Sequence, residues 1–132
     1  MKNTEVLMYL PMMHDDRMLI LPSKSAYEFV HPGLITHVSA ARSYCNVHLN
    51  CGKPILVSKS LKQLSGLLHE QYFYRVHHSY LVNVLYISRI KIHDGDLIEL
   101  KNGICIPLSQ RRKEGFLSHV SGNKNKNTKT KT

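Results

Sequence analysis

The segment YFYRVHHSYLVN, residues 72–83, combines a composition suited to burial with polar side chains suited to contact with another molecule. Its aromatic and β-branched residues are typical of strands. Strict alternation along a strand would place Tyr72, Tyr74 and Val76 on one side and Phe73, Arg75 and His77 on the other. Ser79 is expected to cap a short helical turn that begins at Tyr80. The polar side chains of His77, His78 and Ser79 indicate that a partner outside the fold binds this segment.

Short runs with the composition of strands lie on both sides of this segment. They are Met18–Leu21, Ala26–Val30, Leu34–Val38, Tyr44–Leu49 and Pro54–Val57 before it, and Tyr86–His93, Asp96–Lys101 and Ile104–Leu108 after it. Runs of about five residues separated by turn residues favour an antiparallel, mainly β architecture. Asp94-Gly95 and Asn102-Gly103 are strong hairpin signals, because both central residues of a type I′ turn need a positive φ. The last three runs are therefore expected to form a meander.

One segment, Ser58 to Glu70, has the pattern of an amphipathic helix. Its leucines recur at helical spacing, at Leu61, Leu64, Leu67 and Leu68. Ser58 or Ser60 can cap its start, and the leucine stripe is expected to lie on a sheet. The basic segment QRRKEGFLSHV, residues 110–120, is ambiguous. One interpretation is a short helix with its apolar side chains, Phe116, Leu117 and Val120, turned inward.

The chain is one domain long, and its ends differ in composition from its middle. At 132 residues it can bury one core. Residues 1–16 have weak periodicity and are expected to form a loosely docked arm, followed by the folded domain, residues 17–122. The segment 123–132, NKNKNTKTKT, is expected to be a disordered tail because it cannot bury apolar area. The formal charge is +9, and removing the tail's four lysines leaves +5, which favours a polyanion or an anionic surface as partner.

The cysteines and histidines do not indicate catalysis or metal binding. Three cysteines in no CxxC spacing suit a reducing cytoplasm, and each is expected to act as a small buried hydrophobe. The nine histidines are scattered, and the adjacent pair, His77 and His78, would point to opposite faces of a strand. No run has the roughly 18 apolar residues that a membrane helix needs. We therefore expect neither enzyme activity nor a metal, a cofactor or a membrane span.

Basic and amide side chains gather at three junctions between the predicted strands. These junctions are Ala41-Arg42-Ser43-Tyr44, His77-His78-Ser79 and Ser109-Gln110-Arg111-Arg112-Lys113. Arginine and glutamine form bidentate hydrogen bonds with guanine and adenine edges, whereas lysine and serine hold phosphates. Three such loops along one edge would suit the major groove of duplex DNA. Together with the positive charge, they favour nucleic-acid binding.

Four motifs, in the same order, resemble the LytTR DNA-binding domain, the output module of many bacterial response regulators. They are ITHVS (residues 35–39) with SYC (43–45), SLKQL (60–64), FYRVHHSYLVN (73–83) and the segment 103–112, which contains IPLS. The resemblance covers the chain from about Arg17 to Val120. It implies an elongated, mainly antiparallel β domain with little helix, whose inter-strand loops enter successive major grooves during transcription regulation. It also implies weak or DNA-induced homodimers.

Carried over by position, the resemblance assigns DNA contacts to ten residues. Base contacts fall to Arg42, Ser43, His78, Gln110 and Arg111, and phosphate contacts to Tyr44, His77, Ser79, Arg112 and Lys113. The family usually has arginine in place of His78 and often arginine in place of Gln110. Histidine and glutamine can still read base edges, but they carry no permanent charge, so these two positions bear on both sequence preference and pH response.

Alternatives from other classes use the same features. The first is a single-stranded RNA-binding β module that stacks bases on Tyr72, Phe73, Tyr74 and Tyr80. The others are a metal-dependent enzyme built on the histidines and a module that only recruits proteins. The family's usual receiver domain does not fit into the 16 residues before Arg17. Either a free-standing DNA-binding protein or a piece of a longer regulator is therefore expected.

Overall fold

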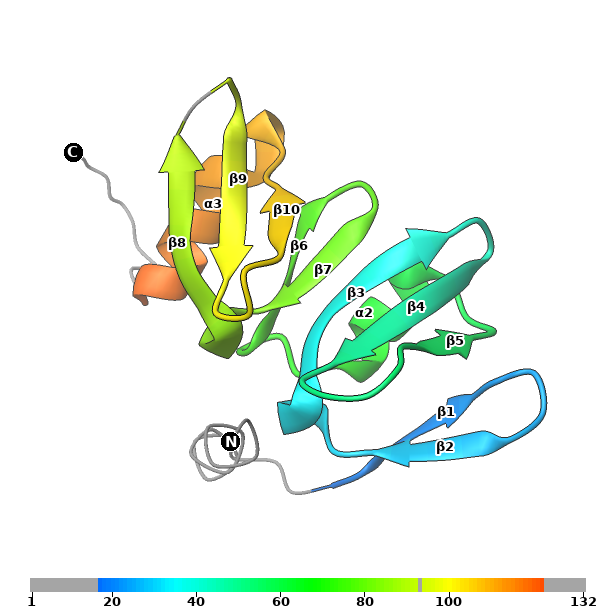
Figure 1. Ribbon diagram of the computed structural model, residues 1–132. Helices are drawn as coiled ribbons and strands as arrows, with labels where there is room; N and C mark the ends of the chain where they lie inside the picture. The colour runs from blue at the N-terminus through cyan, green and yellow to red at the C-terminus, as the bar shows by residue number, and fades with distance from the viewer. Residues whose placement is uncertain (1–16, 93, 123–132) are drawn as a thin grey trace.

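The computed structural model describes residues 17–92 and 94–122, which form ten strands in three antiparallel sheets and two α-helices (Figure 1). The predicted arm, residues 1–16, and the predicted basic tail, residues 123–132, lie outside the described residues, as does His93. The mainly β, antiparallel architecture expected from the sequence is confirmed. Two short 3₁₀ helices, η2 (Pro32–Leu34) and η3 (Val84–Tyr86), connect strands.

The central element is a five-stranded sheet with the order β5-β4-β3-β7-β6. Its strands are β3 (Ile35–Ala41), β4 (Tyr44–Leu49), β5 (Ile55–Val57), β6 (Phe73–His77) and β7 (Tyr80–Asn83). The helical turn predicted from Tyr80 is wrong, because β7 pairs with β6 on one side and with β3 on the other. His78 and Ser79 form the tight turn between β6 and β7 instead. The segment YFYRVHHSYLVN is thus mostly a hairpin inside the main sheet.

The five-stranded sheet separates two hydrophobic cores. Phe73 and Leu81 belong to the first core, together with buried side chains of α2 and the β1–β2 hairpin. Val76 and Val82 belong to the second core, together with the C-terminal sheet and α3. Tyr72 precedes β6 and packs in the first core, so the prediction that it shares a side with Val76 is wrong. Both faces of β6 and β7 are therefore covered, which fixes the position of the turn that joins them.

Two smaller sheets flank this centre. The first pairs β1 (Leu19–Pro22) with β2 (Tyr27–Val30), and the second is the meander of β8 (Ile87–Ile92), β9 (Asp96–Leu100) and β10 (Cys105–Pro107). The predicted meander is confirmed. Asp94 and Gly95 both have a positive φ, 29° and 99°, but Ile92 pairs with Asp96, so three residues link β8 and β9 instead of the two of a type I′ hairpin. In the β9–β10 turn only Gly103 has a positive φ, at 91°, so this turn is not of type I′ either.

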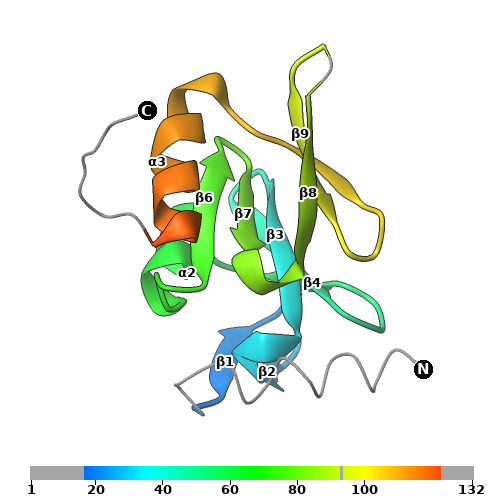
Figure 2. The same cartoon turned by 90° about the vertical axis from the view of Figure 1, so that its left-hand side faces the viewer.

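Two helices cover opposite faces of the main sheet. The first, α2 (Leu61–Leu67), starts with a capping box in which Ser60 accepts from the backbone N–H of Gln63 and the Gln63 side chain accepts from that of Ser60. It is shorter than the predicted range, Ser58–Glu70. The second, α3 (Gln110–Ser121), runs alongside β6 (Figure 2).

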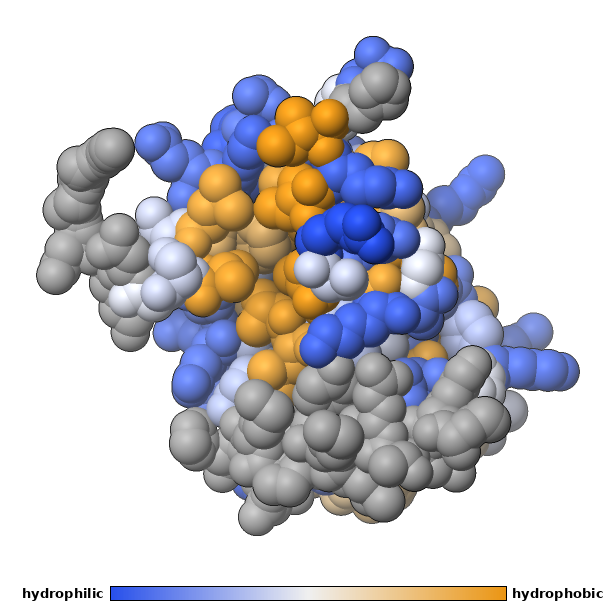
Figure 3. All heavy atoms as spheres, turned by 60° about the vertical axis from the view of Figure 1, so that its left-hand side comes forward, coloured by the Kyte–Doolittle hydropathy of each residue, from blue (hydrophilic) through white to orange (hydrophobic). Residues whose placement is uncertain are grey.

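The orientation of α3 differs from the prediction. Phe116 is buried in the second core, but Leu117 and Val120 are 43% and 47% exposed, so the prediction that all three turn inward is wrong. Figure 3 brings the side with β8 and α3 forward and shows apolar side chains gathered on it. The cysteines also differ from expectation, because Cys45 is buried whereas Cys51 and Cys105 are exposed.

Candidate nucleic-acid interface

The turn between β3 and β4 and the turn between β6 and β7 lie next to each other at one end of the main sheet. Ser39 of β3 pairs with Tyr80 of β7, and the backbone N–H of Ala40 donates to the carbonyl of Ser79 at 2.9 Å. The β3–β4 turn and the β6–β7 turn therefore lie at the same level of the sheet. Arg42 is thus beside the β6–β7 turn, so the first two predicted junctions are neighbours.

The third junction joins the same end of the sheet. The backbone N–H of Ser109 donates to the carbonyl of Val76 at 2.8 Å, which fixes the link between β10 and α3 beside the last residues of β6. Gln110, Arg111 and Arg112 then form the first turn of α3. Figure 1 shows the three junctions along the upper right side of the molecule. The structure therefore brings together residues that are 68 positions apart in the chain, from Ser43 to Arg111.

The β3–β4 turn carries a strained backbone. Arg42 has a φ of 62°, in the left-handed region that residues with a side chain rarely adopt. Arg42 and Ser43 are exposed, and Tyr44 is exposed at the start of β4. Such strain costs about 1–3 kcal/mol and is concentrated at binding and catalytic sites. The turn therefore presents an arginine side chain to solvent on a rigid two-residue link.

The β6–β7 turn is ordered by its own side chains. The backbone N–H of Ser79 donates to Nδ1 of His77 at 3.0 Å, so the neutral ring carries its proton on Nε2. His78 is exposed at the tip, whereas His77 and Ser79 are half-buried. His78 is thus the side chain of this turn that is most accessible to a base edge.

Arg75 is a component of this end that the sequence analysis did not single out. Its Nε donates to the carbonyl of His77 at 3.3 Å, and its Nη2 donates to the carbonyl of His78 at 2.5 Å. Burial lowers the pKa of Arg75, and the nearby charge of Arg112 lowers it further. The guanidinium therefore holds the turn in place from within β6. An arginine inside a run of buried strand residues, two positions before the histidine pair, was the available signal.

The first turn of α3 offers donors for an anion. The side chain of Ser109, the N-cap residue, makes no capping hydrogen bond, so the first backbone N–H groups of α3 lack this partner. Gln110 and Arg111 are exposed and Arg112 is half-buried. Lys113 differs from the other predicted contacts, because its Nζ lies 2.7 Å from a carboxylate oxygen of Asp96. A phosphate at Lys113 would have to compete with that ion pair.

The aromatic side chains do not suit the single-stranded RNA alternative. Tyr72 and Phe73 are each only 5% exposed in the first core, and Tyr74 and Tyr80 pack against the second. Bases stack on exposed aromatic faces. The four side chains therefore serve the fold and do not form a stacking platform.

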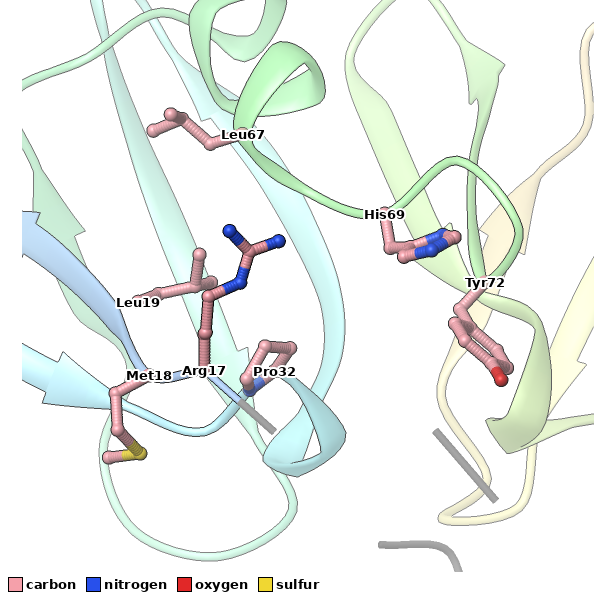
Figure 4. A pocket seen from close by; sticks show the side chains of 7 residues that line it. All are labelled: Arg17, Met18, Leu19, Pro32, Leu67, His69 and Tyr72. Carbon is pink, nitrogen blue, oxygen red and sulfur yellow. The ribbon is translucent and has the colours of Figure 1, made fainter. Parts of the chain in front are cut away.

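A hollow lies away from the three junctions. It has a volume of about 230 Å³. It is lined by Arg17, Met18, Leu19, Pro32, Leu67, His69 and Tyr72 (Figure 4). Pro32 precedes β3 and Leu67 ends α2, so this hollow is at the end of the main sheet opposite to Arg42.

In the described ranges, no three or more His, Cys, Asp or Glu side chains are grouped to hold a metal ion. No described helix is long and apolar enough to span a membrane.

A pair of stacked imidazoles lies within β3 and β4. The rings of His37 and His48 are 4.0 Å apart and nearly parallel. His37 shares a hydrogen bond of 2.9 Å with the Thr36 hydroxyl, and His48 shares one of 2.9 Å with that of Ser39. Burial, with a smaller effect of the charge on His48, lowers the pKa of His37 from 6.5 to about 4. Burial also lowers the pKa of His48.

We expect His37 to make the domain less stable in mild acid. Between pH 6.5 and about 4 the unfolded chain binds a proton at this residue and the folded domain does not. The free energy of unfolding is then highest above pH 6.5 and falls as the pH drops, by ~3 kcal/mol at pH 4. Urea melts across this range would measure the slope. His37→Gln should flatten it and the exposed control His69→Gln should not; an unchanged slope in His37→Gln would contradict the assignment.

Comparison with known proteins gives the family. A family model described as the LytTr DNA-binding domain matches residues 25–121. A solved structure, the LytTr DNA-binding domain of a Bacillus cereus protein described as a methyl-accepting/DNA response regulator, has the same fold. Its TM-score is 0.66 at 23% identity, over 82% of this chain and 99% of that one. No curated protein matches the chain. The resemblance inferred from the sequence is confirmed: the chain belongs to the LytTR DNA-binding domain family.

Proposed function

We propose that this chain binds specific sequences of duplex DNA and regulates transcription, with its three junctions reading successive major grooves. The observation that carries this proposal is the convergence of Arg42, His78 and Arg111 at one end of a single domain, although they come from three separate parts of the chain. Membership of a DNA-binding family supports duplex DNA as the partner.

The roles of the ten residues follow from exposure and chemistry. Arg42, Arg111 and Gln110 can form bidentate hydrogen bonds with purine edges, and His78 and Ser43 can donate to single acceptors. The remaining residues, Tyr44, His77, Ser79, Arg112 and Lys113, can hold phosphates, with Lys113 limited by Asp96. The major groove, about 12 Å wide, admits a two-stranded β-ribbon, so a hairpin turn can reach base edges there.

The wider setting follows from the same function. A regulator of this kind acts in the cytoplasm, without catalysis or a cofactor. Its DNA-binding unit is the folded domain of residues 17–122. Weak or DNA-induced pairing of two copies would double the recognised sequence and raise affinity through the second contact. The signal that controls binding would come from a receiver or signalling domain.

Selection from a pool of random duplexes tests the proposed function. The chain should enrich one short motif or a repeat of it, because base contacts discriminate by about 1–3 kcal/mol per base pair. Competition with single-stranded RNA at matched salt is the control for nonspecific electrostatic binding to phosphates. A pool without an enriched motif, or displacement by RNA at equal concentration, would overturn sequence-specific duplex recognition.

A further inference from the structure

Two more basic turns lie on the same side of the molecule as the three junctions. One is the link between β5 and α2, which carries Lys59, and the other is the β1–β2 turn, which carries Lys24. Neither lysine is among the ten residues with a proposed DNA contact. Their position follows from the strand register and from hydrogen bonds.

The register of β4 and β5 places Lys59. The two strands are antiparallel, and Val57 at the end of β5 pairs with Cys45 near the start of β4. The chain therefore leaves β5 at the level of Tyr44, next to the β3–β4 turn. Lys59 follows two residues later and is half-buried.

Hydrogen bonds from Ser58 place the β1–β2 turn. The backbone N–H and the hydroxyl of Ser58 both donate to the carbonyl of Pro22, at 2.9 and 3.1 Å, and Ser23 forms a β-bridge with Val57. Lys24 is the next residue and is exposed. Figure 1 shows the β1–β2 turn on the same side of the molecule as the end of β5 and the β3–β4 turn. The end of β5 and the β1–β2 turn thus form one unit, which we call the flanking turns.

The charge of the flanking turns suits a phosphate backbone. In the described part of the chain, the ion pairs are Arg89 with Glu99 and Lys113 with Asp96, so neither Lys24 nor Lys59 is neutralised by one of them. The nearest acidic residue along the hairpin is Glu28, which pairs with Leu21 and is half-buried. Lysine acts on phosphate as a mobile point charge and carries no base preference.

We propose that the flanking turns are a further phosphate-binding site, in which Lys24 and Lys59 contact the DNA backbone beyond the bases read by Arg42. This inference rests on the proposed function. Five strands at about 4.8 Å span roughly 20 Å, and the β1–β2 turn extends the row on the side away from Arg111. One helical turn of DNA is about 34 Å long. The extended row therefore reaches a backbone segment that the three junctions do not.

The salt dependence of binding tests this site. The plot of log affinity against log salt has a negative slope, and each neutralised phosphate adds about 0.9 to its steepness. K24A/K59A should therefore make the slope on a 30-bp duplex shallower by about 2. The control K53A/K101A removes the same charge from the β4–β5 and β9–β10 turns at the other end of the sheets and should change the slope by less than about 0.5. K24R/K59R should keep the slope of the parent.

The motif enriched from random duplexes separates the two proposals. K24A/K59A should enrich the same motif as the parent, because phosphate contacts carry no sequence information. If the parent binds duplex DNA but K24A/K59A and K53A/K101A have equal slopes, the flanking turns do not bind phosphate while the proposed function stands. A parent that enriches no motif defeats the proposed function itself. Thermal melts of all three variants, expected to match the parent, show that the slopes report binding.

Discussion

Replacing Arg111 with alanine is expected to weaken binding to the selected duplex by about 1–3 kcal/mol, which is about 5- to 150-fold in the dissociation constant. Its guanidinium is exposed in the first turn of α3, at the end of the sheet where the three junctions meet. His78→Ala should have an effect of the same order, since His78 is the exposed tip of the neighbouring turn. Fluorescence anisotropy on the selected duplex and on a random one would measure both losses.

The comparison between the two duplexes decides whether these side chains read bases. Loss of a base contact should affect the selected duplex far more than the random one. Arg89→Ala is a matched control, because Arg89 is an exposed arginine of β8 that pairs with Glu99 at 2.8 Å, and it should bind both duplexes as the parent does. Equal losses on both duplexes in Arg111→Ala would reject direct readout by that residue.

The second large effect is on stability. Replacing Phe116 with alanine should lower the free energy of unfolding by about 3–5 kcal/mol, because the ring is 1% exposed and its removal leaves a cavity in the second core. The ring lies 5.5 Å from that of Tyr74 and helps to hold α3 against β6. A variant that still folds should also bind the selected duplex more weakly, because Gln110 and Arg111 depend on this packing. Urea denaturation would measure the loss of stability.

The neighbouring residue supplies the control for this substitution. Leu117→Ala removes a side chain of similar chemistry that is largely exposed, so its cost should stay near 0.5 kcal/mol. Similar costs for Phe116→Ala and Leu117→Ala would show that α3 does not dock through Phe116.

Local signals in the sequence predicted most of the sheet. The range Tyr44–Leu49 matches β4, and the glycine at each predicted hairpin turn lies at a positive φ. The main error was the start of a helix at Tyr80. Serine is favoured both at helix N-caps and in turns, so Ser79 alone does not distinguish the two. The pairing of β7 with β3, which decides between them, joins residues more than 40 positions apart and leaves no local mark.

The candidate site was predictable in composition but not in its support. The basic and amide residues of the three junctions stand out in the sequence, whereas their common position depends on the bonds from Ala40 to Ser79 and from Ser109 to Val76. The role of Arg75 depends on the hydrogen bond from its side chain in β6 to the carbonyl of His78 in the following turn. Both depend on tertiary packing, as does the choice of Phe116 over Leu117 as the buried residue of α3.

Titration of the labelled protein with the selected duplex, followed by the backbone amide resonances in NMR, tests the central claim most directly. The largest shifts should come from Arg42, His78 and Arg111, with little change at the opposite turns near Gly52 and Gly103. Large shifts at those opposite turns, with unchanged resonances at the three junctions, would contradict the account.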